Sequence, residues 1–61
     1  MQIIITSTDA DRNAKATFTW SEDLENCDVV AYGFEDEEMD AMISAGAHEG
    51  SDLEGYNVEL S

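Results

Sequence analysis

The side chains of this sequence that could do chemistry are mainly carboxylates, and many of them occur in two groups. The first group consists of Glu35, Asp36, Glu37, Glu38 and Asp40. The second consists of Glu22, Asp23, Glu25 and Asp28. Helix neighbours three and four residues apart lie about 5–6 Å apart, and phosphates repeat about every 3.4 Å along a DNA strand. A helical row of carboxylates can therefore present negative charge at a spacing comparable to that of alternate phosphates.

The run at 35–40 also has a purely structural interpretation. Acids are stabilising in the first turn of a helix because the helix dipole is positive there, so the run could be a solvated helix start. The chain contains fifteen acids and only two basic residues, Arg12 and Lys15. This excess favours binding to a partner, but both interpretations stay open at this point.

A calcium site is the next candidate, because Asp9, Asp11 and Asn13 match the opening of an EF-hand loop. The rest of the loop does not match. Ala14 stands where that loop needs glycine, and Trp20 stands where it needs a bidentate glutamate. We therefore expect a turn between two strands and no metal site.

No pattern of catalytic residues is present. A zinc site needs three or four nitrogen, sulfur or carboxylate ligands, whereas the chain has one histidine, His48, and one cysteine, Cys27. No serine lies in a nucleophile motif. A chain of 61 residues also leaves little room for a pocket that excludes water. We expect a protein that is not an enzyme and has no cofactor.

The net charge of −13 limits the possible partners. Nucleic acids and anionic membranes are bound through lysine and arginine, so we expect no direct contact with either. The charge favours a basic surface of a nucleic-acid-binding protein or ribonucleoprotein complex. It also exceeds the magnitude of roughly 2–8 that suffices for the solubility of a small domain, so either a partner or a high-salt cell interior must explain it.

Length and composition predict a single domain, residues 1–61, in the cytoplasm. No apolar run approaches the ~18 residues of a membrane span. The first residues lack the basic region of a signal peptide. A lone cysteine cannot form an internal disulfide, which fits a reducing compartment. The oligomeric state is left open.

Hydrophobic periodicity predicts the elements that position the acids. Residues 2–8 and 15–20 alternate as two strands of an antiparallel hairpin, with Ile3 and Ile5 on one face and Ile4 on the other. Residues 29–34 favour a third strand by composition, although a helix over 22–32 is a competing interpretation. Residues 56–60 alternate as a last strand.

The clearest helix covers residues 35–46, with Met39, Met42, Ile43 and Gly46 on one face and Gly46 as its C-cap. The predicted fold is α+β: a small antiparallel sheet of three to four strands with one helix packed on one face, in the order β-β-β-α-β. Among the aromatic residues, Trp20 and Tyr32 are predicted interface anchors at the sheet edge, with Trp20 partly buried against the helix.

In its size, its acidity, its two acidic groups and its lack of a catalytic motif, the chain resembles small acidic phage-encoded inhibitors, the class that includes anti-CRISPR and antirestriction DNA mimics. The resemblance implies a cytoplasmic protein that binds a host CRISPR-Cas complex or restriction nuclease and blocks DNA recognition by imitating nucleic-acid charge. This class shares no alignable motif, so the resemblance assigns no role to an individual residue.

Two alternatives remain. Proteins of salt-loving organisms are similar in their acid excess and scarce lysine, so the chain could be a small halophilic structural domain. It could also be a regulatory acidic subunit that binds a basic protein unrelated to nucleic acid. The sequence does not separate these alternatives from an inhibitor.

Overall fold

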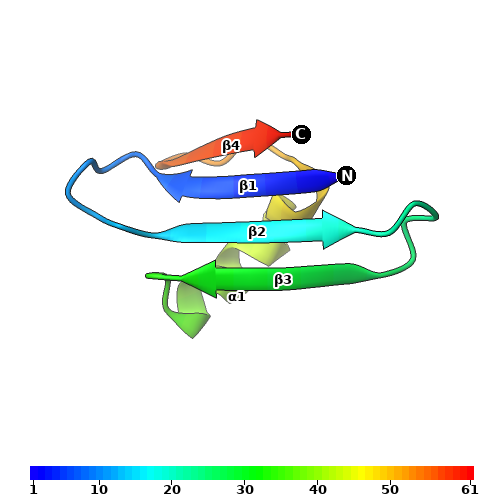
Figure 1. Ribbon diagram of the computed structural model, residues 1–61. Coiled ribbons are helices and arrows are strands. Elements are labelled where there is room, and N and C mark those ends of the chain that lie inside the picture. Colours follow the sequence, from blue (N-terminus) through cyan, green and yellow to red (C-terminus); the bar gives the residue numbers. More distant parts are fainter.

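The computed structural model describes residues 1–61 and contains a four-stranded sheet backed by one helix (Figure 1). Its strands are β1 (Gln2–Ser7), β2 (Lys15–Trp20), β3 (Cys27–Tyr32) and β4 (Tyr56–Leu60). Between β3 and β4 the chain forms α1 (Asp36–Ser44) and the short 3-10 helix η1 (Ala47–Glu49). The strands lie in the order β3-β2-β1-β4, and every neighbouring pair is antiparallel. The predicted α+β fold and the order of its strands and helix are confirmed.

The period-2 alternation of β1 and β2 places their apolar side chains on the helix side of the sheet. Ile3, Ile5 and Phe18 have no exposed surface there. Ala16 of β2 is buried beside them, and Met42 of α1 and Ala47 of η1 complete the buried core from the helix side. The predicted hairpin therefore lies at the centre of the fold, because its two strands occupy the middle of the sheet.

The third strand begins and ends two residues earlier than predicted. A tight loop after β2 brings Ser21 and Asn26 together, with the Ser21 N–H donating to the Asn26 carbonyl at 2.9 Å, so pairing with β2 resumes at Cys27. Gly33 ends the strand with a φ of +76°. A Cβ atom on Gly33 would lie 2.4 Å from the Asn13 carbonyl oxygen, so only glycine fits at this turn. The competing helix over 22–32 is wrong.

Helix α1 is shorter than predicted, and of the four residues on its predicted inner face only Ile43 is exposed. Glu35 is its N-cap in a capping box with Glu38, and Gly46 follows the C-cap residue Ala45 in the left-handed conformation. Met42 is buried, but Ile43 is 38% exposed. The sheet-facing side of α1 is therefore Glu38, Met39 and Met42, because polar contacts of Glu38 described below hold that side of the helix inward.

Strand β4, the last in the chain, lies beside β1 at one edge of the sheet. The Gln2 and Ser61 backbones exchange two hydrogen bonds of 3.0 Å, so β4 runs antiparallel to β1. The outer face of the sheet, opposite α1, is covered by no other element (Figure 1). No helix in the structure is long and apolar enough to cross a membrane.

Candidate functional site

Almost all of the negative charge lies at the surface without a cation beside it. Fourteen of the fifteen acidic side chains belong to exposed residues; the exception is Glu38, which is partly buried. Only two carboxylates have a cationic partner: Glu38 pairs with Arg12, and Glu49 lies 3.4 Å from His48, which is charged only when protonated. Thirteen carboxylates are thus unneutralised on a molecule whose accessible surface is 4203 Å².

Four residues of the run at 35–40 form one exposed group at the start of α1. We call Glu35, Asp36, Glu37 and Asp40 the helix acids. Asp36 and Asp40 are one turn apart on the solvent side of the helix, and Glu37 lies beside them. The predicted row of carboxylates is therefore short, because α1 has only nine residues and three of the helix acids fall within its first turn or at its cap.

Glu38, the fifth acid of that run, is part of the fold and is not available on the surface. Its carboxylate accepts hydrogen bonds from the Arg12 guanidinium and from the Tyr56 hydroxyl, the latter at 3.1 Å. The pKa of Glu38 is lowered to about 2, mainly by the hydrogen bond from Arg12; desolvation opposes the shift, and the bonds from Tyr56 and the Glu35 backbone contribute to it. Glu38 is therefore removed from the predicted partner-binding set.

Arg12 joins this cluster to the turn after β3. Its guanidinium also donates to the Gly33 carbonyl at 2.9 Å and lies 5.1 Å from the centre of the Phe34 ring, a cation–π contact. The rings of Phe34 and Tyr56 meet edge to face at 5.8 Å. Arg12, one of the two basic residues of the chain, thus connects the β1–β2 loop to α1 and, through Glu38, to β4.

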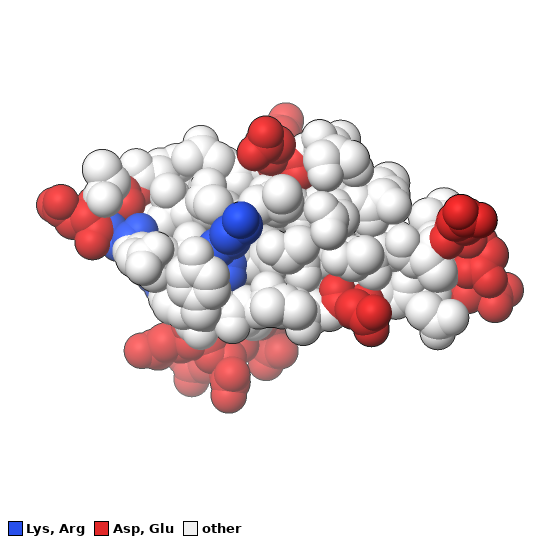
Figure 2. All heavy atoms as spheres, viewed as in Figure 1, with Lys and Arg blue, Asp and Glu red and all other residues white.

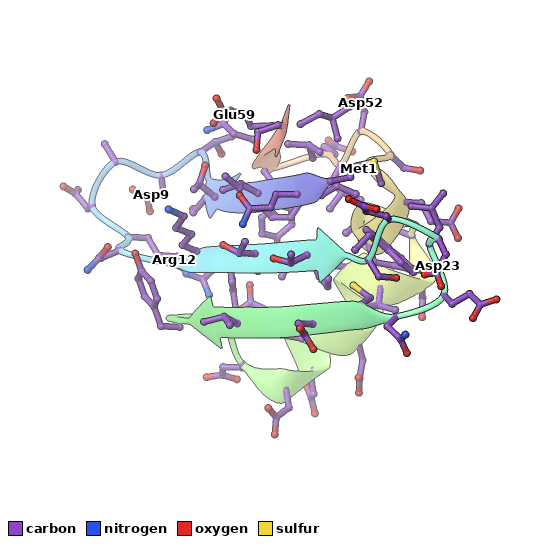
Figure 3. All side chains as sticks on the ribbon, turned by 45° about the vertical axis from the view of Figure 1, so that its right-hand side comes forward. Met1, Asp9, Arg12, Asp23, Asp52 and Glu59 are labelled. Carbon is purple, nitrogen blue, oxygen red and sulfur yellow. The ribbon has the colours of Figure 1, made fainter.

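The second acidic group is split by the structure into a loop and a strand residue. Glu22, Asp23 and Glu25, which we call the loop acids, lie in the turn between β2 and β3, and Asp23 projects from that end of the sheet, away from Arg12 (Figure 3). Asp23 accepts hydrogen bonds from the Ser21 hydroxyl and the Glu25 N–H, and these bonds lower its pKa. Asp28 lies within β3, opposite Thr19 on the outer face of the sheet.

An exposed leucine interrupts the loop acids. Leu24 is 58% exposed and has a φ of +60°, the only positive φ at a residue other than glycine. With Met1, Trp20 and Glu49 it lines a shallow pocket of about 310 Å³. This apolar side chain is a candidate contact that sequence reasoning missed, because nothing in the residue types around Leu24 indicates a left-handed conformation.

The outer face of the sheet carries little charge. Its register places Ile4, Thr17 and Val30 in one row across three strands, and Lys15 beside Tyr32 in the next row. Asp28 and Glu59 are the acids whose side chains share this face. Figure 2 shows the result: a face dominated by uncharged atoms, with the acids gathered at its margins.

The two predicted aromatic anchors differ in position and availability. Tyr32 lies on the edge strand β3 as predicted, whereas Trp20 lies on the inner strand β2, so its predicted place at the sheet edge is wrong. Trp20 is partly buried against the core cluster that contains Met42, and its indole N–H donates to the His48 carbonyl at 2.6 Å. Tyr32 is 52% exposed on the outer face. Tyr32 is thus free to contact a partner, whereas the polar atom of Trp20 is already used inside the fold.

No arrangement in the structure could hold a metal ion through three or more His, Cys, Asp or Glu side chains. The residues that resemble the start of an EF-hand form a turn instead: the Asp9 carboxylate accepts the Asp11 N–H at 3.0 Å, and the Asp9 carbonyl accepts the Arg12 N–H at 3.1 Å.

Comparison with known proteins finds no match for this chain among protein-family models, curated proteins or solved structures.

Proposed function

We propose that this protein is an inhibitor that binds, through its carboxylates, the cationic nucleic-acid-binding surface of a host defence complex, either a CRISPR-Cas complex or a restriction nuclease. It would act by competing with DNA for that surface. The observation that carries the proposal is the set of thirteen exposed carboxylates that have no cation beside them. Mutual repulsion of these groups opposes folding, and a partner rich in lysine and arginine would relieve it.

The distance between the two acidic groups supports a contact that spans several phosphate-binding positions of the partner. The loop acids precede β3 and the helix acids follow it, so the six residues of this strand separate them. At about 3.3 Å per residue, the strand spans roughly 20 Å. Phosphates spaced about 3.4 Å apart would number about six over that length. A cationic groove that holds a DNA strand could thus meet both acidic groups at once.

At this density, the negative charge of the protein would mainly speed its encounter with the partner and orient the two molecules. An isolated exposed ion pair is worth about 0–1 kcal/mol, but a field of one sign accelerates association and orients the partners. Apolar contacts would then supply residence time, and the exposed candidates are Leu24, Val30 and Tyr32. The host-defence identity of the partner comes from the resemblance to phage-encoded inhibitors.

The test is a competition for DNA. Purified CRISPR-Cas surveillance complexes and restriction nucleases are incubated with the protein and then with labelled target DNA, and complex formation is followed by mobility shift. We expect DNA binding by the susceptible complex to be lost at equimolar protein. Direct affinity for that complex should fall steeply as salt rises, because screening weakens charge pairing. The proposal is contradicted if every complex and nuclease tested still binds DNA normally in the presence of excess protein.

A halophilic structural domain is the second candidate, and the same unneutralised carboxylates favour it. The core contains only six buried residues, so self-repulsion can outweigh it at low ionic strength. Thermal unfolding followed across potassium chloride concentration separates the candidates. A halophilic domain should be unfolded near 0.15 M salt and fold toward molar salt, whereas the proposed inhibitor should already be folded at 0.15 M, where the Debye length is about 8 Å.

A further inference from the structure

The free edge of β3 carries backbone groups that no other part of the chain uses. The order β3-β2-β1-β4 leaves β3 with a neighbour on one side only. The Ser21 N–H donates to Asn26, and hydrogen-bonded pairs alternate along an antiparallel ladder, so Asp28, Val30 and Tyr32 direct their backbone groups toward β2. The N–H and C=O groups of the intervening residues point away from the sheet; these residues are Cys27, Val29 and Ala31.

This edge has only one of the features by which natural sheets prevent further pairing. Such features include charged side chains or proline on the edge, a bulge, a very short strand or a covering loop. The single charged side chain of β3 is Asp28, on the outer face of the sheet. Strand β3 has six residues in continuous register with β2, contains no lysine or proline, and has Val29, Val30 and Tyr32 at 49, 70 and 52% exposure. An added strand would find both backbone partners and apolar side chains here.

The opposite edge of the sheet is less open. On β4 the outward-facing residues are Tyr56, Val58 and Leu60, by the same alternation from the bonded pair of Gln2 and Ser61. The Tyr56 N–H is already taken by the Leu53 carbonyl at 3.4 Å. Strand β4 is also shorter, with five residues. These differences select β3 as the edge for a partner.

Charge decides what kind of strand this edge accepts. A second copy would bring together two chains of net charge −13 each, which repel. The helix acids lie behind and beneath β3, and the loop acids lie at its N-terminal end (Figures 1 and 2). A segment docked on this edge would therefore run between two acidic groups, and lysine or arginine on that segment would be complementary to both.

We propose that the free edge of β3 binds a cationic extended segment of the partner protein, which joins the sheet as a fifth strand. The backbone ladder would supply register, and the acids would select a basic sequence. This inference rests on the proposed function for the cationic character of the partner alone. Pairing through β3 does not depend on whether the partner is a defence complex.

The test uses the full chain labelled with ¹⁵N and a capped synthetic peptide of alternating lysine and valine. A peptide of alternating lysine and proline has the same charge but cannot form a ladder, so it is the matched control. We expect the lysine–valine peptide to slow amide hydrogen exchange at Cys27, Val29 and Ala31 by about tenfold or more. The Val58 and Leu60 amides on the other edge should be unaffected.

A variant provides a second readout. Val29→Pro removes a donor that faces outward, which an edge strand tolerates, and Val58→Pro makes the same change on β4. Only Val29→Pro should weaken peptide binding, by about tenfold or more, with the circular-dichroism spectrum as the check on folding. If Val29→Pro does not fold, the exchange pattern of the unmodified chain decides.

Three results would overturn the proposal: no protection by the lysine–valine peptide, equal protection by the lysine–proline peptide, or protection without peptide together with a doubled mass in sedimentation. The last result would place a second copy on the edge. Different results would contradict the proposed function and the edge proposal. Protection of β3 without inhibition of any defence complex would contradict the inhibitor alone, and inhibition that Val29→Pro leaves unchanged would contradict the edge proposal alone.

Discussion

Arg12 and Glu38, which are 26 residues apart in the chain, form its single ion pair between a permanent cation and a carboxylate. The pair joins the β1–β2 loop to the first turn of α1, and Tyr56 of β4 donates to the same carboxylate. Glu38 is thereby the one carboxylate of the fifteen that is partly buried and paired with a permanent cation. The remaining acids of the 35–40 run face solvent, so a stretch that is uniform in sequence has two separate roles.

The Glu38 carboxylate should make the stability of the protein depend on acid pH. Its pKa falls from the usual value of 4.5 to about 2 in the folded protein. A lowered pKa stabilises the folded state above the unfolded pKa, and that contribution is lost as pH falls from about 4.5 to about 2. Glu38→Gln should therefore be less stable than the natural chain at pH 7, and the difference in free energy of unfolding should shrink to near zero at pH 2. Urea unfolding at several pH values measures it, with Glu37→Gln as the exposed control.

Leu24 should be a position where a smaller side chain stabilises the fold. The left-handed conformation costs a residue with a Cβ atom about 1–2 kcal/mol, and glycine adopts it without strain. Because glycine also gains entropy in the unfolded chain, we expect Leu24→Gly to raise the free energy of unfolding by only roughly 0.5–1 kcal/mol. Calorimetry should show a higher Tm, by a few degrees. Leu60→Gly, at a similarly exposed strand position, should lower the Tm; a fall for both variants would contradict this expectation.

The helix acids should contribute to partner binding more than to folding. Paired reversals, Glu35→Lys with Asp36→Lys and Glu37→Lys with Asp40→Lys, remove about 0.3–1 kcal/mol of helix-dipole stabilisation per acid and relieve repulsion that offsets part of this loss. The first pair also removes the Glu35 side of the capping box, which costs about 0.5–2 kcal/mol more. Against a cationic groove, losing one partner of a buried charge pair costs about 2–5 kcal/mol of affinity. Binding to the defence complex should thus weaken more than tenfold with the fold intact.

Neutral changes outside the two acidic groups are the controls for this experiment. Glu54→Gln and Glu59→Gln should leave the affinity nearly unchanged. If the paired reversals leave binding within about twofold while the circular-dichroism spectrum stays native, recognition depends on the loop acids or on the exposed apolar side chains, and the helix acids are a solvated helix start.

Neighbouring isoleucines of β1 should respond very differently to aspartate. Ile5 has no exposed surface, whereas Ile4 lies partly exposed on the outer face. An unpaired buried charge costs several kcal/mol, and a chain of this length has a total stability of about 3–9 kcal/mol. Ile5→Asp should therefore unfold the protein, and Ile4→Asp should leave it folded with reduced stability. Backbone amide dispersion in an NMR spectrum distinguishes the two, and similar spectra would show that the faces are assigned wrongly.

The amino-acid sequence by itself determined the elements whose signals are local. Alternation in β1, β2 and β4 and the acid-rich start of α1 depend on neighbours a few residues apart, so the order of residue types is enough to predict them. The acidic groups and the excess of charge are equally visible in the sequence. The end of β3 is not, because a side chain at Gly33 is excluded by the Asn13 carbonyl, which lies twenty residues earlier in the chain.

Tertiary structure alone decided which acids are free and which edge is open. Glu38 is indistinguishable from Glu37 in the sequence, and only the arrival of Arg12 and Tyr56 beside it lowers its pKa and holds its side of α1 against the sheet. In the same way, the order of strands, and not their composition, leaves β3 at an edge. Both outcomes depend on contacts between distant segments, whose energies are set by geometry that forms only when the whole chain is folded.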